Sequence, residues 1–218
     1  HAHRVARAAI GSVPVVGSAA VEAFSALVTP PLEKRRTAWM EAVATELQRL
    51  SASRGLSLDD LRTNEDFLDV LFEASQAAIK TSQEEKLAAL KNAVLNAAAA
   101  SSPDESRMKI YVRLVDDLTV WHLRVLTLVN NPTAWFKAQG KPVPEFHLTG
   151  SLDALLLKAF PELRDQREFY DYIWKDLYGK GLVGTESLHV MMTPSGVFAT
   201  RSTELAQGFL QFIQRPEQ

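Results

Sequence analysis

The stretch with the most suggestive chemistry is GKGLVG at residues 179–184, which has the G-x-G-x-x-G spacing of a dinucleotide-binding loop. In such a loop a strand precedes the first glycine and a helix follows the third, because the pyrophosphate lies at the N-terminus of that helix. Here a helical pattern at 165–178 comes first and a strand-like run at 182–192 follows. The order is reversed, so we interpret the glycines as turn residues, with Gly179 as the left-handed residue that ends the helix.

Other residue types that could support catalysis are scattered along the chain. His122, His147 and His189 are isolated and lack HExxH or any comparable spacing of metal ligands. Carboxylates that are adjacent in sequence do not by themselves converge on one substrate atom, as acid–base catalysis requires; these pairs are Asp59-Asp60, Glu84-Glu85 and Asp116-Asp117. The absence of cysteine excludes disulfides and thiolate chemistry. The sequence therefore predicts a non-enzymatic protein with no catalytic residue, cofactor or metal.

The composition is that of an ordinary globular protein. The 218 residues are 46% hydrophobic and carry a net charge of -2. This length can bury a sizeable core, as one large domain or two small ones. The near-neutral charge provides no field that would attract DNA or an acidic membrane. We expect a cytoplasmic protein, with membrane association as an alternative.

The N-terminal region supports that alternative. Residues 8–28 contain one charged residue, Glu22, and the basic run EKRR follows at 33–36. The length is close to that of a membrane helix, and positive flanking charge is typical of one. However, Gly11, Pro14 and Gly17 interrupt the run, and Glu22 would be costly in hydrocarbon. We therefore predict a packed helix from about Ser18 to Thr29 and retain membrane contact through residues 8–36 as the alternative.

Residues 1–103 are predicted to form an N-terminal helical bundle. Pro30-Pro31 is expected to open a new helix, because proline suits a first helical turn. Its apolar seam runs from Met40 through Val43 and Leu47 to Leu50. Asn64 is expected to cap the next helix, whose predicted buried stripe is Phe67, Leu68, Leu71, Phe72 and Ile79. A third helix is predicted from about Gln83 to Ala100. These apolar faces suggest that the bundle packs across a homodimer.

Residues 104–218 resemble a winged-helix domain, a helix-turn-helix with an added β-hairpin. The resemblance rests on Leu118-Thr119 with Leu123 and Leu126, the run 181–183, and Thr203-Glu204-Leu205 with Phe209-Leu210. Predicted helices are followed by strands at 182–192 and 197–200, a turn at 193–196 and a last helix from Thr203. The expected fold class is thus mainly α: an N-terminal bundle plus a winged-helix-like domain with a small hairpin.

The charges argue against DNA as the main partner of this domain. From Arg164 to Lys180 four basic residues are matched by four acidic ones, and the expected wing at 185–189 contains no lysine or arginine. DNA readers place basic side chains against phosphates. We predict a protein-contact surface, with a DNA-binding regulator as the alternative. The candidate residues of this interaction surface are Lys34, Arg35, Arg36, Arg164, Arg167, Lys175 and His189.

A second resemblance concerns the run VPVVGSAAVEAFSALVTPPLEKRRTAW at residues 13–39. It is similar to the start of uncharacterised bacterial proteins, some of which resemble the Abi-alpha abortive-infection proteins. The resemblance implies a part in anti-phage defence or stress response. The sequence thus predicts a non-catalytic bacterial protein-interaction module that binds another protein or itself. The alternatives are a DNA-binding regulator and a membrane-acting effector that uses residues 8–28.

Overall fold

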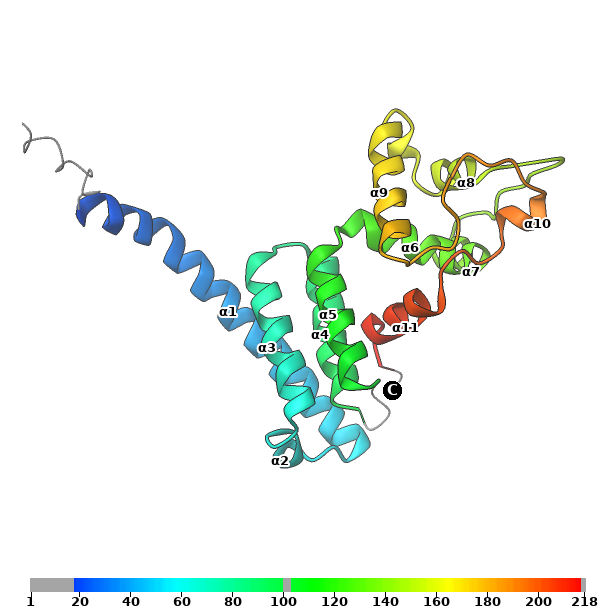
Figure 1. The fold of residues 1–218 in the computed structure, drawn as a ribbon. Helices are drawn as coiled ribbons and strands as arrows, with labels where there is room; N and C mark the ends of the chain where they lie inside the picture. Colours follow the sequence, from blue (N-terminus) through cyan, green and yellow to red (C-terminus); the bar gives the residue numbers. More distant parts are fainter. Residues whose placement is uncertain (1–17, 100–102, 217–218) are drawn as a thin grey trace, which may run out of the picture.

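The computed structural model describes residues 18–99 and 103–216, and every regular element in this part of the chain is a helix (Figure 1). The expectation of a mainly α-helical fold is confirmed. In chain order the elements are α1 (Ser18–Arg54), α2 (Leu58–Leu61), α3 (Glu65–Lys80), α4 (Glu84–Ala97), α5 (Glu105–Asp117), α6 (Val120–Asn130), α7 (Pro132–Ala138), α8 (Leu152–Ala159), the short 3-10 helix η1 (Pro161–Leu163), α9 (Arg167–Gly179), α10 (Pro194–Val197) and α11 (Glu204–Ile213).

The first helix is longer than predicted. Helix α1 runs without a break for 37 residues and contains Pro30 and Pro31 in its interior, so the expected boundary at these prolines is wrong. Proline lacks the N–H that would bond to the carbonyl four residues earlier, here Ala26 and Leu27. Both of these residues are exposed, so water can reach the two carbonyls that lose their helical partner. The N-terminal half of α1 projects away from the rest of the molecule (Figure 1).

The bundle is formed by α3, α4 and α5 with the C-terminal half of α1. As predicted, Asn64 caps α3: its Oδ1 accepts a hydrogen bond from the N–H of Phe67 at 3.0 Å. The buried stripe of α3 is Phe67, Val70, Ala74, Ala77 and Ala78. Phe72 belongs to the predicted stripe but is 59% exposed, because it lies about 140° around the helix from Phe67.

The second half of the described chain packs α6, α7, α8 and α9 around large side chains that include Phe136, Leu156 and Trp174. Helix α11 then returns to the bundle and lies on α4 (Figure 1). Asn92 and Asn96 of α4 donate side-chain hydrogen bonds to the carbonyls of Ile213 at 2.9 Å and Phe212 at 2.7 Å. These bonds satisfy carbonyls at the C-terminal end of α11 that have no partner within the helix.

The predicted β-hairpin is wrong. Within the described residues, 182–192 and 197–200 form no strand, and the only pairing there consists of two isolated bridges, Gly150 with Met192 and Val183 with Ser202. The expected turn at 193–196 instead begins α10, because Thr193 Oγ1 accepts the N–H of Gly196 and Pro194 occupies the first turn. Of the apolar residues that suggested strands, Leu182, Val183 and Leu188 are buried in the core, whereas Val190 and Met191 are exposed. A helical domain without a wing replaces the winged-helix arrangement.

The glycine-rich run ends α9, although Gly179 is not its left-handed residue. Helix α9 includes Gly179, and the positive φ of 70° falls on Gly181. The N–H of Gly181 donates to the carbonyl of Tyr178, and the N–H of Leu182 to that of Leu177. This pattern of bonds is the Schellman motif, and it brings Leu177 and Leu182 together in the core. The glycine-rich run at 179–184 therefore forms the C-terminal end of α9 and its cap.

Candidate interaction surface

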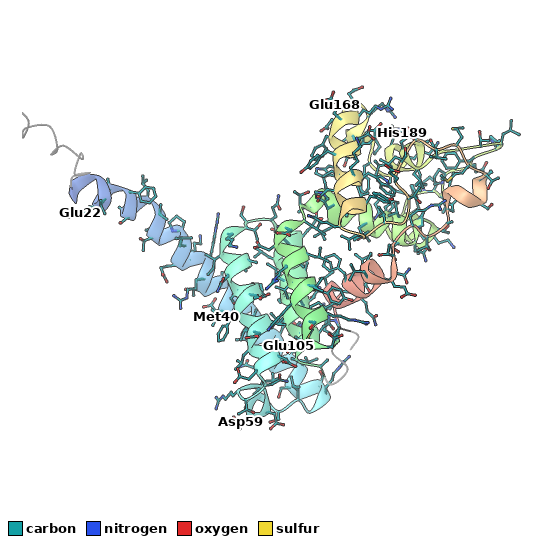
Figure 2. All side chains as sticks on the ribbon, viewed as in Figure 1. Glu22, Met40, Asp59, Glu105, Glu168 and His189 are labelled. Atoms are coloured by element: carbon teal, nitrogen blue, oxygen red, sulfur yellow. The ribbon has the colours of Figure 1, made fainter. Side chains whose placement is uncertain are left out.

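The N-terminal half of α1 exposes large apolar side chains. Val21, Phe24, Leu27 and Leu32 are 54%, 66%, 74% and 40% exposed. Single exposed apolar residues are common, but a contiguous apolar patch on a protein surface marks a contact site. Figure 2 shows this half, with Glu22 near its end, extending beyond the bundle. We call residues 21–34 the projecting segment; within the described chain, no other element covers its apolar side chains.

The apolar face of the projecting segment continues the face by which α1 packs on the bundle. Successive residues lie about 100° apart around a helix, so Val21 and Leu32 lie on the same side as Trp39 and Val43. Trp39 and Val43 are buried, and Trp39 Nε1 donates a hydrogen bond to Ser75 Oγ of α3 at 2.9 Å. The predicted seam included Met40, but Met40 is 53% exposed and Trp39 takes its place in the contact. One apolar stripe is thus covered by the bundle at one end only.

A groove of about 470 Å³ lies beside α1 where the stripe leaves the bundle. Small side chains create it, because alanine provides no atoms beyond Cβ. Its lining comes from α1, the C-terminal end of α3 and the start of α4: Arg35, Ala38, Trp39, Ala42, Ala78, Thr81, Ser82, Glu84, Leu87, Ala88 and Lys91. Sequence reasoning missed this groove. The alanines at 38 and 42, four residues apart on one side of α1, are the signal that could have found it.

The basic cluster at 34–36 borders this groove. Lys34, Arg35 and Arg36 are all exposed. Arg35 lines the groove, and its guanidinium donates to the carbonyl of Ile79 at 3.3 Å, near the C-terminal end of α3. A cation is favoured there by the partial negative charge of the helix end. Lys34 and Arg36 lie about 100° to either side of Arg35 and flank the groove face.

The other predicted contact residues lie elsewhere. Arg164, Arg167 and Lys175 are exposed on α9 and the turn before it, far from the N-terminal half of α1 (Figure 1). Arg167 Nε is 3.6 Å from Asp171 Oδ2, so an acidic neighbour offsets its charge. The structure therefore does not bring the seven predicted residues together on one surface.

His189 is held between two carboxylates. Its Nε2 lies 2.7 Å from Asp171 Oδ1 of α9, and its Nδ1 lies 3.3 Å from Asp153 Oδ2 of α8. A general base needs a ring nitrogen that faces the substrate, and both nitrogens of His189 already face acidic side chains. The residue joins the segment before α10 to α8 and α9. In the part of the chain described, no group of three or more His, Asp or Glu residues is arranged to hold a metal ion.

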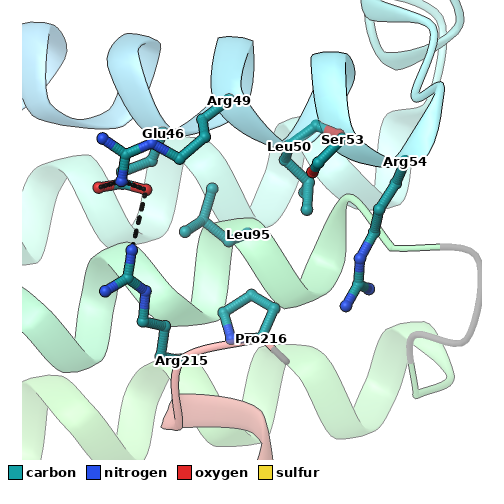
Figure 3. A pocket seen from close by; sticks show the side chains of 8 residues that line it. All are labelled: Glu46, Arg49, Leu50, Ser53, Arg54, Leu95, Arg215 and Pro216. Atoms are coloured by element: carbon teal, nitrogen blue, oxygen red, sulfur yellow. Dashed lines mark hydrogen bonds and ion pairs between the residues drawn. The ribbon is translucent and has the colours of Figure 1, made fainter. Parts of the chain in front are cut away.

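A second hollow lies where the chain returns to α1 after α11 (Figure 3). Glu46 of α1 faces Arg49 at 3.1 Å and Arg215 at 3.9 Å, next to Leu95 and Pro216. Its volume of about 40 Å³ is far below the several hundred Å³ of a small-molecule site. This hollow is a packing contact between the C-terminal segment and the bundle.

Within residues 18–99 and 103–216, no helix combines the length and apolar character that crossing a bilayer requires. Residues 8–17 of the predicted membrane segment lie outside the described residues. Comparison with protein-family models, with curated proteins and with solved structures finds no match to the chain.

Proposed function

We propose that the protein is a non-catalytic interaction module whose binding element is the projecting segment of α1. One observation supports this most directly: the stripe that packs on the bundle at Trp39 continues, uncovered, through Leu32 and Phe24 to Val21. Isolated helices of this length are marginally stable in water, because most helix stability comes from packing of an apolar face. A protein partner on the stripe would supply the missing packing.

The two alternatives find less support. A DNA-binding regulator would need a recognition helix or wing rich in basic groups, whereas Asp171 lies beside Arg167 on α9 and the expected hairpin is not formed. The apolar stripe, with Lys34 and Arg36 near its inner end, would suit a membrane-acting effector, but between residues 21 and 32 the only charged residue is the acidic Glu22. The sequence run 13–39, which resembles the start of uncharacterised bacterial proteins, some of them similar to Abi-alpha proteins, includes the projecting segment. We therefore connect the proposed contact to bacterial anti-phage defence or stress response.

Photo-crosslinking in bacterial cells tests the proposal. Phe24 is replaced by a photoreactive phenylalanine analogue in the full chain, and Leu148, which is 86% exposed on a loop, serves as the matched control. We expect irradiation to give protein adducts from position 24 and none from position 148. Adducts with lipid alone, or no adducts at position 24, would show that the segment is not a protein-binding element.

A further inference from the structure

We infer that the projecting segment docks on a second copy of this chain, antiparallel to α1, with Phe24 and Leu27 of each copy in the groove of the other. This inference names the partner for the proposed function and rests on it. The groove and the side chains that would fill it lie on the same helix, so a symmetric pair can satisfy both at once.

The groove and the projecting side chains share one side of α1. Taking about 100° per residue, Phe24 and Ala42 point in the same direction, and Pro31 and Ala38 lie within about 40° of that direction. A partner helix laid along this side therefore meets the groove at one end and Phe24 with Leu27 at the other. The groove volume of about 470 Å³ falls in the range that buries a drug-sized molecule, so it can take both side chains.

The spacing makes this arrangement self-complementary. Phe24 and Ala38 are 14 positions apart, or about 21 Å along the helix axis, and Pro31 lies midway between them. A two-fold axis at Pro31 places Phe24 of each copy over Ala38 of the other. Such an interface is isologous, with the same patch used on both subunits, and it forms a closed dimer. The alanines let the partner helix approach closely.

The acidic residues of the projecting segment lie away from the side of α1 that carries Phe24, so that side can be buried without burying a carboxylate. Glu22 lies about 160° from Phe24 and Glu33 about 180°, so both carboxylates stay in water when the face is covered. Arg35 lies on the face but already donates to the carbonyl of Ile79. Helices that lie on membranes carry lysine and arginine along their polar side. Between residues 21 and 32 the only charge is the acidic Glu22, which favours a protein partner over a lipid surface.

Cysteine crosslinking tests the geometry, and the chain contains no cysteine of its own. The full-length variant Pro31→Cys has one thiol per chain, on the proposed two-fold axis, so a disulfide can form only between two copies, and Phe24 and Leu27 are kept. We expect mild oxidation to give a covalent dimer. The matched control, Glu33→Cys, places its thiol about 160° around α1 from position 31 and is expected to give little.

Light scattering after size exclusion gives the second measurement. We expect wild-type protein to have twice the chain mass of 24.2 kDa, and Phe24→Asp to raise the dimer dissociation constant by more than about tenfold while its bundle still unfolds cooperatively on heating. Monomeric wild-type protein, or equal crosslinking by the control variant, overturns the inference. If Phe24 nevertheless forms adducts with a different protein in cells, the proposed function stands and only the second copy is wrong; if it forms none, both fail.

Discussion

His122 provides a pH test of the packing between α6 and α9. Its side chain is 3% exposed, and its Nδ1 accepts the backbone N–H of Thr119 at 3.1 Å. The proton of the neutral ring is therefore on Nε2, which lies 3.2 Å from Asp176 Oδ2 without the alignment of a hydrogen bond. Burial lowers the pKa of His122; Asp176 opposes this shift, and Lys180 adds to it.

The sign of the effect on stability follows from the protons bound in each state. The unfolded imidazole has a pKa of about 6.5, and the folded one binds its proton only at lower pH. The contribution of His122 is therefore fully present above pH 6.5 and is lost as the pH falls from there toward the folded pKa. One proton changes the free energy of unfolding by at most about 1.4 kcal/mol per pH unit. Because the unfolded imidazole is only half protonated at pH 6.5, the loss between pH 6.5 and 5.5 is at most about 1 kcal/mol. In a chain of this size that corresponds to a Tm decrease of at most about 2–4 °C.

Urea unfolding of His122→Asn and wild type at pH 7.5, 6.5 and 5.5 measures this contribution. The asparagine amide oxygen can still accept the N–H of Thr119 but does not titrate. We expect the variant to lose up to about 1 kcal/mol less than wild type between pH 6.5 and 5.5. His189→Asn is the control, because it removes the other histidine that contacts carboxylates and leaves His122 in place. Equal pH slopes in wild type and His122→Asn would refute the assignment.

Two substitutions test how α11 is attached to the bundle. A Cβ added at Gly208 would overlap the phenol oxygen of Tyr111, so Gly208→Ala is expected to cost about 1–3 kcal/mol in urea unfolding. The cost should be clearly smaller in a Tyr111→Phe background, which lacks this oxygen, and an equal cost in both backgrounds would contradict the clash. Asn96 donates to the carbonyls of Phe212 at 2.7 Å and Gln214 at 2.8 Å. Asn96→Ala should cost about 1–3 kcal/mol and speed hydrogen exchange in α11, and unchanged exchange would show that these bonds do not hold the helix.

The helices were predictable where periodicity and a cap coincide. Asn64 before α3 and Thr203 before α11 both accept the backbone N–H three residues later, as their residue types indicate. Because proline disfavours the helix interior, Pro30 and Pro31 predict a boundary that α1 does not have. The penalty is smaller on an exposed stretch, where water bonds to the freed carbonyls. Local sequence gave the helix-forming pattern on both sides but not this solvent exposure.

The missing wing shows what local patterns leave open. Leu182, Val183 and Leu188 are buried, as in a half-buried strand. The partner that covers them is a set of helices rather than a second strand, and Trp174 Nε1 of α9 donates to the carbonyl of Thr185 at 2.9 Å. Alternation of apolar residues indicates that one side is covered but does not identify the element that covers it. Whether such a run forms a strand or an irregular segment therefore depends on which distant part of the chain packs against it.

The sequence of the projecting segment is compatible with two kinds of partner, a membrane and a protein. An apolar run with a basic flank fits both a lipid environment and a protein partner, because both remove apolar side chains from water. The charges of the segment distinguish them: between residues 21 and 32 the only charged residue is the acidic Glu22, whereas a helix that lies on a membrane carries lysine and arginine along its polar side. Trp39 shows how the apolar stripe of α1 is used, since the bundle covers it there with small residues of α3 and α4. A partner that repeats this contact further along α1 needs a side chain large enough to fill the groove, and Phe24 of a second copy meets that requirement.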